Sequence, residues 1–168
     1  MKAQLSFDFY FSLIVFVMFV SSLFFKFVTF FPFYSDEIAN QRLRLEAYQI
    51  SEILINDAGY PGDWYKDVPN AKRLGLSDET KNKTNLVSIS KMAALDDLCK
   101  SESGYNRVLA LLDINDGFLA QLIKKSEPPS SVTCLPADIS AKISANMTRI
   151  VAFDDGSFGE LAVKVWKK

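Results

Sequence analysis

The feature that most constrains this chain is a long apolar run near its N-terminus. Residues 9–25 read FYFSLIVFVMFVSSLFF without a charge; Lys26 interrupts the run, which then continues to Tyr34. A helix rises about 1.5 Å per residue, so about 20 such residues cross the hydrocarbon core of a bilayer. The run is apolar on every side, as expected of a helix that faces lipid or other apolar helices. We predict a transmembrane helix in which Lys26 extends toward an interface.

The flanks of this run predict how it inserts. It is longer than the apolar core of a secretory signal, about 7–15 residues, and no A-x-A-like cleavage site follows, so we expect the span to be retained. Lys2 precedes the run and Asp36 and Glu37 follow it. The positive-inside rule then places the N-terminus in the cytoplasm and the rest of the chain outside, although Arg42 and Arg44 lie near the far end.

The remainder of the chain has the composition of an ordinary soluble domain. Of the 14 Phe, 11 lie between Phe7 and Phe33. The net charge is −1 and the charges form no basic stripe, so no nucleic-acid contact is predicted. Histidine is absent, which removes the commonest general base and metal ligand. No nucleophile, phosphate-binding or metal-ligand motif is present, so we predict no catalytic residues, no metal, no cofactor and no enzyme activity.

The two cysteines are Cys99 and Cys134. An even number fits an oxidising compartment, and we expect a disulfide if this part of the chain is extracytoplasmic; two free thiols are the alternative. The bond would close a loop of about 34 residues and stabilise the fold by roughly 3–4 kcal/mol in the chain-entropy description.

Patterning predicts that the helix leads into a small head. Pro32 favours a kink or a restart near residues 31–34, with Ser35 as the new N-cap. Residues 36–56 form a helix, because small and apolar side chains recur at spacings of three and four. These side chains are Ala39, Leu43, Ala47, Ile50 and Leu54.

The later segments predict an α+β head with a mostly antiparallel sheet. Residues 59–64 form a turn, residues 66–84 are irregular, and residues 90–100 and 104–112 form two short helices. A strand is expected at 118–123, then a proline-containing loop at 126–138 and a hairpin of strands 142–153 and 158–166 around Asp154-Asp155-Gly156-Ser157. The sheet therefore has about three strands, with Leu161, Val163 and Val165 facing the helix.

Several polar motifs receive a structural interpretation. Residues 113–117 read DINDG and resemble part of a calcium loop, but the glycine position and the missing twelfth-position Glu favour a helix-to-strand turn. The acidic pairs at 96–97 and 154–155 are expected on the solvated surface. Asn82 and Asn146 each begin an N-x-T glycosylation motif; Asn82 lies in a polar loop and Asn146 in a strand.

The first residues, MKAQLSFDFYFSL, resemble the class III signal segment of archaeal type IV pilin-like proteins. In that pattern a short basic leader precedes Q-x-S-x-[DE] and an apolar helix. The resemblance implies processing between Ala3 and Gln4, with Ser6 at the serine position and Asp8 at the acidic one. The family prefers Glu where this chain has Asp8, and its leader here would be only three residues long.

A second resemblance lies in the head, where residues 59–64 read GYPGDW. This is similar to the G-x-P-x-[ND]-W motif of a group of archaeal pilin-like secreted proteins, which implies that Gly59, Pro61, Asp63 and Trp64 form a structural motif. Other matching pieces follow in the same order: Gly75-Leu76; Asn85, Leu86, Lys91 and Leu95; Tyr105, Val108, Leu111 and Leu112; and Val163, Val165 and Trp166.

The resemblance implies a leader at 1–3, a transmembrane and assembly helix at 4–34, an extracytoplasmic continuation at 35–57 and an α+β head at 58–168. A prepilin peptidase would free the α-amine of Gln4, which could pair with Asp8 of a neighbouring subunit and set the register between helices. The partners would then be membrane lipid, the peptidase and other pilin-like subunits. The chain would be a single-pass protein of the cytoplasmic membrane with its head at the cell surface or in a filament.

Two other interpretations stay open on the residues alone. The chain could be a single-span envelope protein that never polymerises and carries an adhesive or accessory head. It could also be a membrane-tethered enzyme, although no residues that would assemble a site are found.

Overall fold

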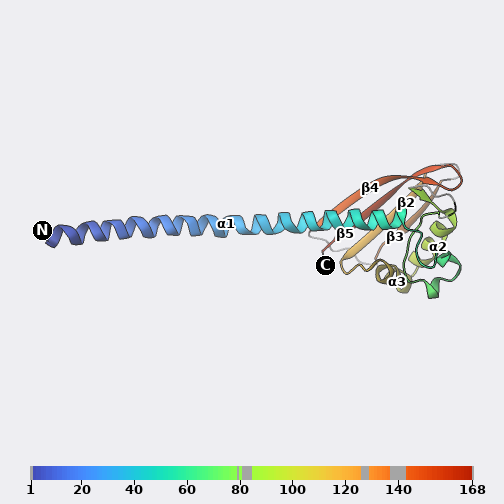
Figure 1. Ribbon diagram of the computed structural model, residues 1–168, viewed down its shortest axis with the longest axis horizontal. Helices are drawn as coiled ribbons and strands as arrows, with labels where there is room; N and C mark the ends of the chain where they lie inside the picture. Colours follow the sequence, from blue (N-terminus) through green and yellow to red (C-terminus); the bar gives the residue numbers. More distant parts are fainter. Residues whose placement is uncertain (1, 79, 81–84, 126–128, 137–142, 168) are drawn as a thin grey trace. The chain divides into compact units, whose positions relative to one another are not determined.

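The computed structural model describes residues 2–78, 80, 85–125, 129–136 and 143–167, and of residues 2–6 it describes the backbone alone. The chain divides into two compact units, residues 1–39 and 40–168. Helix α1 (Lys2–Asn56) contributes to both units. The first unit contains the apolar segment, defined here as residues 7–34, and the second contains the head, defined here as residues 40–168 (Figure 1).

Helix α1 does not restart at Pro32, so that part of the prediction is wrong. Pro32 lies inside the helix, and Ser35 is an interior residue rather than an N-cap. Proline removes one backbone donor, but the apolar residues on both sides keep their own helical hydrogen bonds. The helical pattern of residues 36–56 is confirmed to its end at Asn56.

Beyond α1 the chain makes two short 3-10 turns, η1 (Trp64–Lys66) and η2 (Val68–Asn70), and a short strand, β1 (Leu86–Val87). Helices α2 (Ile89–Cys99) and α3 (Glu102–Leu112) follow and confirm the two predicted helices. The predicted turn at 113–117 is also confirmed: Asp113 caps α3 in the left-handed conformation, and β2 begins at Gly117.

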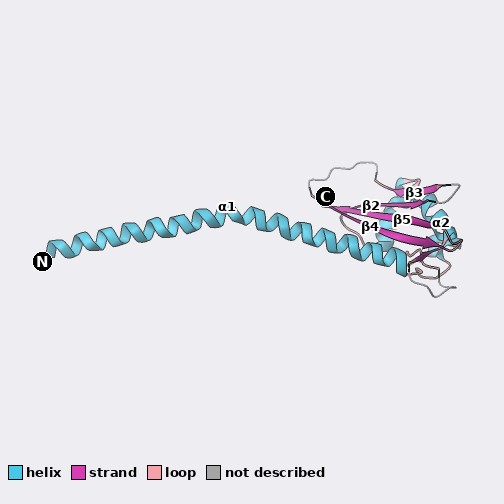
Figure 2. Cartoon of the chain, turned by 90° about the horizontal axis from the view of Figure 1, so that it is seen from above, coloured by secondary structure: helices cyan, strands magenta, loops and turns pink. Residues whose placement is uncertain are grey.

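The sheet consists of β1, β2 (Gly117–Lys124), β3 (Ser130–Cys134), β4 (Ser144–Phe153) and β5 (Phe158–Trp166). Its order is β1-β4-β5-β2-β3, and Figure 2 shows the four longer strands side by side. The pairs β2–β3, β2–β5 and β4–β5 are antiparallel, whereas β1 runs parallel to β4. A mostly antiparallel sheet in an α+β head is therefore confirmed.

The predicted strand count was too low, since the described part of the chain contains five strands rather than about three. Strand β3 lies in the segment predicted as a loop. Its alternating burial of Val132 and Cys134 fits a strand, but the nearby prolines hid that signal, and pairing with β2 stabilises it as the sheet edge. Strand β1 has two residues and is defined only by its pairing with β4.

One buried cluster joins the C-terminal part of α1 to the sheet and to α2 and α3. On α1 it contains Leu43, Ala47, Ile50 and Leu54, all predicted from their spacing. On β5 it contains Leu161, Val163 and Val165, each fully buried, which confirms the predicted inward face. The head therefore closes a core of its own around one face of the helix.

Candidate functional site

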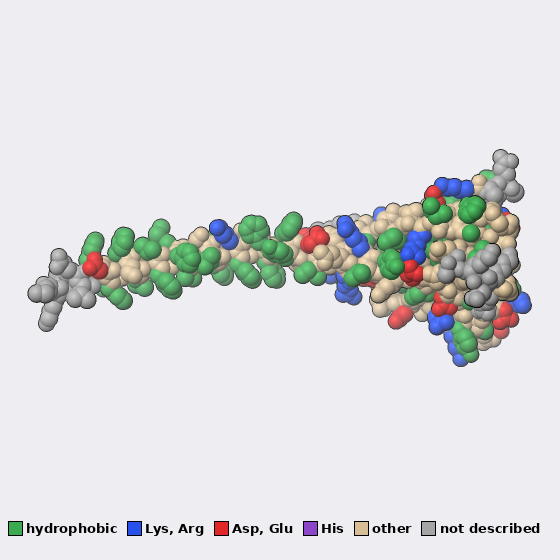
Figure 3. Space-filling model, turned by 45° about the horizontal axis from the view of Figure 1, so that its top comes forward, with side chains coloured by type: hydrophobic (Ala, Val, Ile, Leu, Met, Phe, Trp, Pro, Cys, Tyr) green, Lys and Arg blue, Asp and Glu red, His purple; other side chains and the backbone are tan. Residues whose placement is uncertain are grey.

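The apolar segment is covered by exposed hydrophobic side chains. Among the described residues, α1 is the one helix that is long and apolar enough to cross a membrane, and its most apolar stretch is not buried. Figure 3 shows hydrophobic side chains along the visible face of this part of α1. A core helix of a soluble domain would be mostly buried, so the exposure favours contact with lipid or with other apolar helices.

The predicted processing and assembly residues lie in this part of the helix. Ala3, Gln4 and Ser6 belong to α1, but their side chains lie outside the described residues. Asp8 is described and exposed on the helix surface. The processing step and the Gln4–Asp8 contact between subunits stay predictions.

The motif at 59–64 folds into a compact cluster just after the end of α1. Gly59 has φ +82°, and a Cβ there would meet the Trp64 indole at 2.5 Å. The Trp64 side chain is fully buried, and its Nε1 donates to the Gly75 carbonyl at 2.8 Å. A Cβ on Gly75 would in turn lie 2.2 Å from the Asp57 carbonyl oxygen. Only glycine fits at these two positions, and the buried Trp64 indole packs between them just after the end of α1.

The remaining motif residues contribute less to this cluster. Pro61 follows a cis peptide bond in the turn. Asp63 makes no side-chain cap for η1 and instead lies 3.8 Å from Lys66 on the surface. Asp57 takes the polar role instead, because it accepts from the Gly59 amide at 2.8 Å and pairs with Arg73 at 2.8 Å. Sequence reasoning gave the Asp57–Arg73 pair no role, since the two residues are 16 positions apart.

Lys91 holds α2 against the end of α1. Its side chain is 3% exposed, and its Nζ donates to the carbonyls of Ala58 at 2.7 Å and Ser77 at 2.9 Å. These two hydrogen bonds offset part of the cost of burying the ammonium group. Lys91 is one of the residues that match the pilin-like pattern, but only the fold shows that its buried side chain links α2 to the end of α1.

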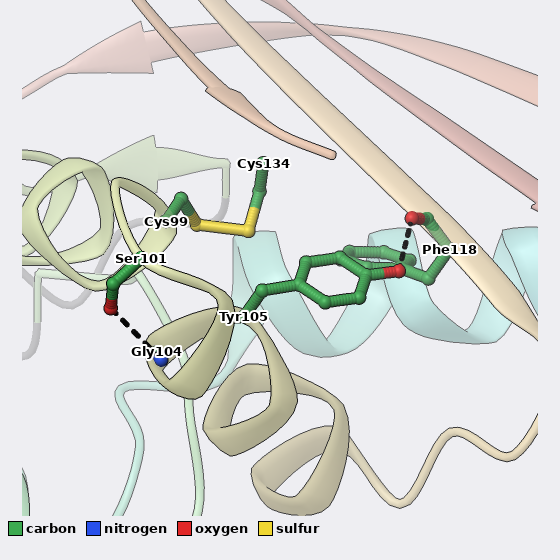
Figure 4. Close-up of a disulfide and its surroundings, with 6 residues drawn as sticks. All are labelled: Cys99, Ser101, Gly104, Tyr105, Phe118 and Cys134. Carbon is green, nitrogen blue, oxygen red and sulfur yellow. Dashed lines mark hydrogen bonds between the residues drawn. A yellow bond between two sulfur atoms is a disulfide. The ribbon is translucent and has the colours of Figure 1, made fainter. Parts of the chain in front are cut away.

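The predicted disulfide between Cys99 and Cys134 is present and joins the end of α2 to the edge strand β3 (Figure 4). Next to it, Ser101 caps α3 by accepting from the Gly104 amide at 3.1 Å. The Tyr105 hydroxyl donates to the Phe118 carbonyl at 2.8 Å. Burial raises the pKa of the Tyr105 hydroxyl. The disulfide and this hydrogen bond both fix the α2–α3 pair to the sheet.

A second polar contact fixes α1 to β4. Arg149 pairs with Glu52, and its guanidinium lies 4.9 Å from the centre of the Tyr48 ring. The hydrogen bond from Arg149, followed by one from Tyr48, lowers the pKa of Glu52.

The pKa of Glu46, six residues earlier on α1, is shifted in the opposite direction. Burial and then the charge of Asp116 raise the pKa of Glu46, while Arg42 opposes the rise.

The two acidic pairs are surface features with structural partners. Asp96 and Asp97 both pair with Lys100. In the β4–β5 turn, Asp154 accepts from the Ile89 amide, so it is more than a solvated side chain. Hydrogen bonds from Lys124 and then Ser157 lower the pKa of Asp155.

The two glycosylation motifs differ in what the structure says of them. Asn82 lies outside the described residues. Asn146 and Thr148 are both exposed on β4, two positions apart and therefore on one face of the sheet. The side chains that a glycan-transfer enzyme reads are accessible there, and occupancy of Asn146 stays a prediction.

The described residues contain no arrangement that suggests catalysis. Among them, no group of three or more His, Cys, Asp or Glu could hold a metal ion. A cavity of about 460 Å³ lies between η1, α2 and α3, with Tyr65, Asp97 and Arg107 in its wall. Arg107 donates to the carbonyls of Pro69 and Ala71, and Asp97 pairs with Lys100, so these charges serve the fold.

No protein-family model matches the sequence, and no curated protein matches it. The class that these observations define is an α+β protein with a long N-terminal apolar helix.

Proposed function

We propose that this chain is a structural subunit of a pilin-like filament, either an archaeal surface pilus or a secretion pseudopilus. Helix α1 carries the proposal: it runs from Lys2 to Asn56 without a break, is apolar and unburied over residues 7–34, and packs one face on the sheet from Leu43 onward. A helix that is apolar on every side needs lipid around it before assembly, and neighbouring apolar helices after assembly.

The charges at the two ends of the apolar segment suggest how the subunit is inserted and assembled. Lys2 precedes the segment and Asp36 and Glu37 follow it, which favours a cytoplasmic N-terminus and an extracytoplasmic head. The disulfide fits that compartment. After cleavage between Ala3 and Gln4, the new α-amine offsets the desolvation of Asp8 on a neighbouring copy.

N-terminal sequencing of protein recovered from cells with a prepilin peptidase tests the processing step. We expect the chain to begin at Gln4 in the assembled fraction, with a mass lower by three residues. An assembled protein that still carries Met1 would contradict the proposal. Electron microscopy with a label on a tag added after Lys168 should find the head along the filaments.

Substitution of Asp8 tests assembly apart from insertion. Asp8→Ala should insert in the membrane but leave the cells without filaments, because the α-amine loses its partner. Asp8→Glu is the matched control and should retain filaments, since it keeps the charge. If Asp8→Ala polymerises normally, or the wild-type chain is found only as a stable monomer in detergent, the single-span envelope protein becomes the better interpretation.

A further inference from the structure

Asp8 and Lys26 are the charged residues of the apolar segment, and they have opposite signs. They are 18 residues apart, which is about five turns of a helix at 3.6 residues per turn. Both therefore point to the same side of α1, which is helical throughout this range, about 27 Å apart along its axis. Both side chains are exposed, and their separation prevents them from pairing within one chain.

The spacing matches the thickness of a bilayer. The uncharged residues between Asp8 and Lys26 span about 26 Å, close to the roughly 30 Å of the hydrocarbon core. A single inserted chain can therefore keep Asp8 at one interface and Lys26 at the other, with both side chains hydrated. Moving the helix out of the lipid toward a filament removes one of these charges from its own interface, and that charge then needs a partner.

Three arrangements of two neighbouring helices can be compared by charge. Parallel helices in register place Asp8 beside Asp8 and Lys26 beside Lys26, which repels at both ends. Antiparallel helices pair the charges, but copies inserted the same way cannot adopt this arrangement. Parallel helices offset by five turns bring Asp8 of one copy beside Lys26 of the other.

We propose that copies of this chain associate through this five-turn offset, with Asp8 of the outer copy paired to Lys26 of the inner one. The inference rests on the proposed function and adds the axial register and the partner residue. Each pair leaves one Asp8 and one Lys26 available for further copies, so the contact is head-to-tail and does not close on itself. Such a contact gives an open polymer rather than a dimer.

Cysteine cross-linking can measure this register while both charges stay in place. Val15 and Phe33 are also 18 residues apart and lie within about 20° of the Asp8–Lys26 side of the helix. Two differently tagged full-length copies, one with Val15→Cys and one with Phe33→Cys, are co-expressed and oxidised in membranes and in filaments. In filaments we expect at least tenfold more mixed adduct than with the control pair Val15→Cys and Ser22→Cys, which lies on the same side of the helix but is only seven residues apart.

Charge reversal tests whether the ion pair sets the register. Adding Lys26→Asp to the Phe33→Cys copy should reduce the adduct at least tenfold, and adding Asp8→Lys to the Val15→Cys copy should restore it. If filaments form without the Val15–Phe33 adduct, or if neither charge reversal changes the yield of the adduct, the proposed register is wrong. Either result leaves the filament proposal intact. The adduct in membranes of cells that never form filaments would uphold the pairing and overturn the filament.

Discussion

The apolar segment and the head use the same side chain in opposite ways. Phe19 in the segment is 62% exposed, whereas Phe118 in the head is 1% exposed and belongs to the buried cluster. The head buries most of its hydrophobic residues in one core formed by α1, the sheet and two short helices, and leaves a few, such as Ile150 and Phe158, exposed. The segment has no such cover in the chain itself. Its stability therefore depends on an external apolar phase, while that of the head does not.

The largest expected difference between the two regions is between matched phenylalanine substitutions, one in each. Phe118→Ala should destabilise the head by about 3–5 kcal/mol, because it removes a buried ring and leaves a cavity. Phe19→Ala should change the unfolding free energy of the head by less than about 0.5 kcal/mol. Denaturant unfolding of the full chain in detergent, followed by tryptophan fluorescence from Trp64 and Trp166, would measure both. Equal effects would show that the segment and the head unfold as one unit.

Removal of the disulfide should give the next largest effect. The double variant Cys99→Ser and Cys134→Ser should lose about 2–4 kcal/mol of head stability, because the unfolded chain regains the freedom of the closed loop. Insertion of the apolar segment into membranes should not change. Thermal unfolding and alkaline extraction of membranes measure the two properties, and an unchanged melting temperature would show that burial alone holds β3 in place.

Two glutamates on α1 should respond to pH in opposite directions. The pKa of Glu46 is raised, so the folded head holds that proton more tightly than the unfolded chain does. The contribution of Glu46 to the folding stability therefore falls as pH rises from about 4.5 through the raised pKa. Glu46→Gln should therefore raise the melting temperature at pH 7. The pKa of Glu52 is lowered, so its contribution to the folding stability is complete above pH about 4.5. That contribution is lost as pH falls through the lowered pKa.

Glu52→Gln serves as the matched variant and should lower the melting temperature at pH 7 by breaking the pair with Arg149. Below the lowered pKa the variant and the wild type should converge. Melting curves between pH 3 and 8 would follow both residues. The same sign for the two variants would contradict the assignment of burial to Glu46 and of the ion pair to Glu52.

The smallest effect on stability is expected at Asn146. Asn146→Gln on the exposed face of β4 should change the free energy of unfolding by less than about 0.5 kcal/mol. If the site is occupied, the variant should lose the mass of one glycan, while Thr148→Ser keeps the motif and the mass. Intact-mass spectrometry of protein from the native host measures whether Asn146 carries a glycan. If the wild type and the variant differ only by the mass of the substituted side chain, Asn146 is not glycosylated and the prediction is wrong.

Much of the fold could be predicted from local patterns. The spacing of Leu43, Ala47, Ile50 and Leu54 predicted a helix with one buried face, and alternation at Leu161, Val163 and Val165 predicted the inner face of β5. These signals are local because the period of a helix or a strand appears within a few residues.

Other features needed partners that are distant in sequence. Strands β1 and β3 exist through their pairing with β4 and β2, and Pro32 lies inside a continuous helix where local reasoning expected a kink or a restart. The contacts of Lys91 with Ala58 and Ser77 join residues 33 and 14 positions apart. Side-chain type alone does not say which carbonyls a lysine will meet once the chain is folded.

The sequence by itself determined that this protein has a long apolar helix with Asp8 and Lys26 five turns apart, since helical geometry converts spacing directly into position. Only the tertiary structure decided how the head closes around the end of that helix. There Gly59, Trp64 and Gly75 fit together because a side chain at either glycine would overlap its neighbours. Exclusion of that kind depends on atoms brought together from separate segments, so no pattern along the chain encodes it.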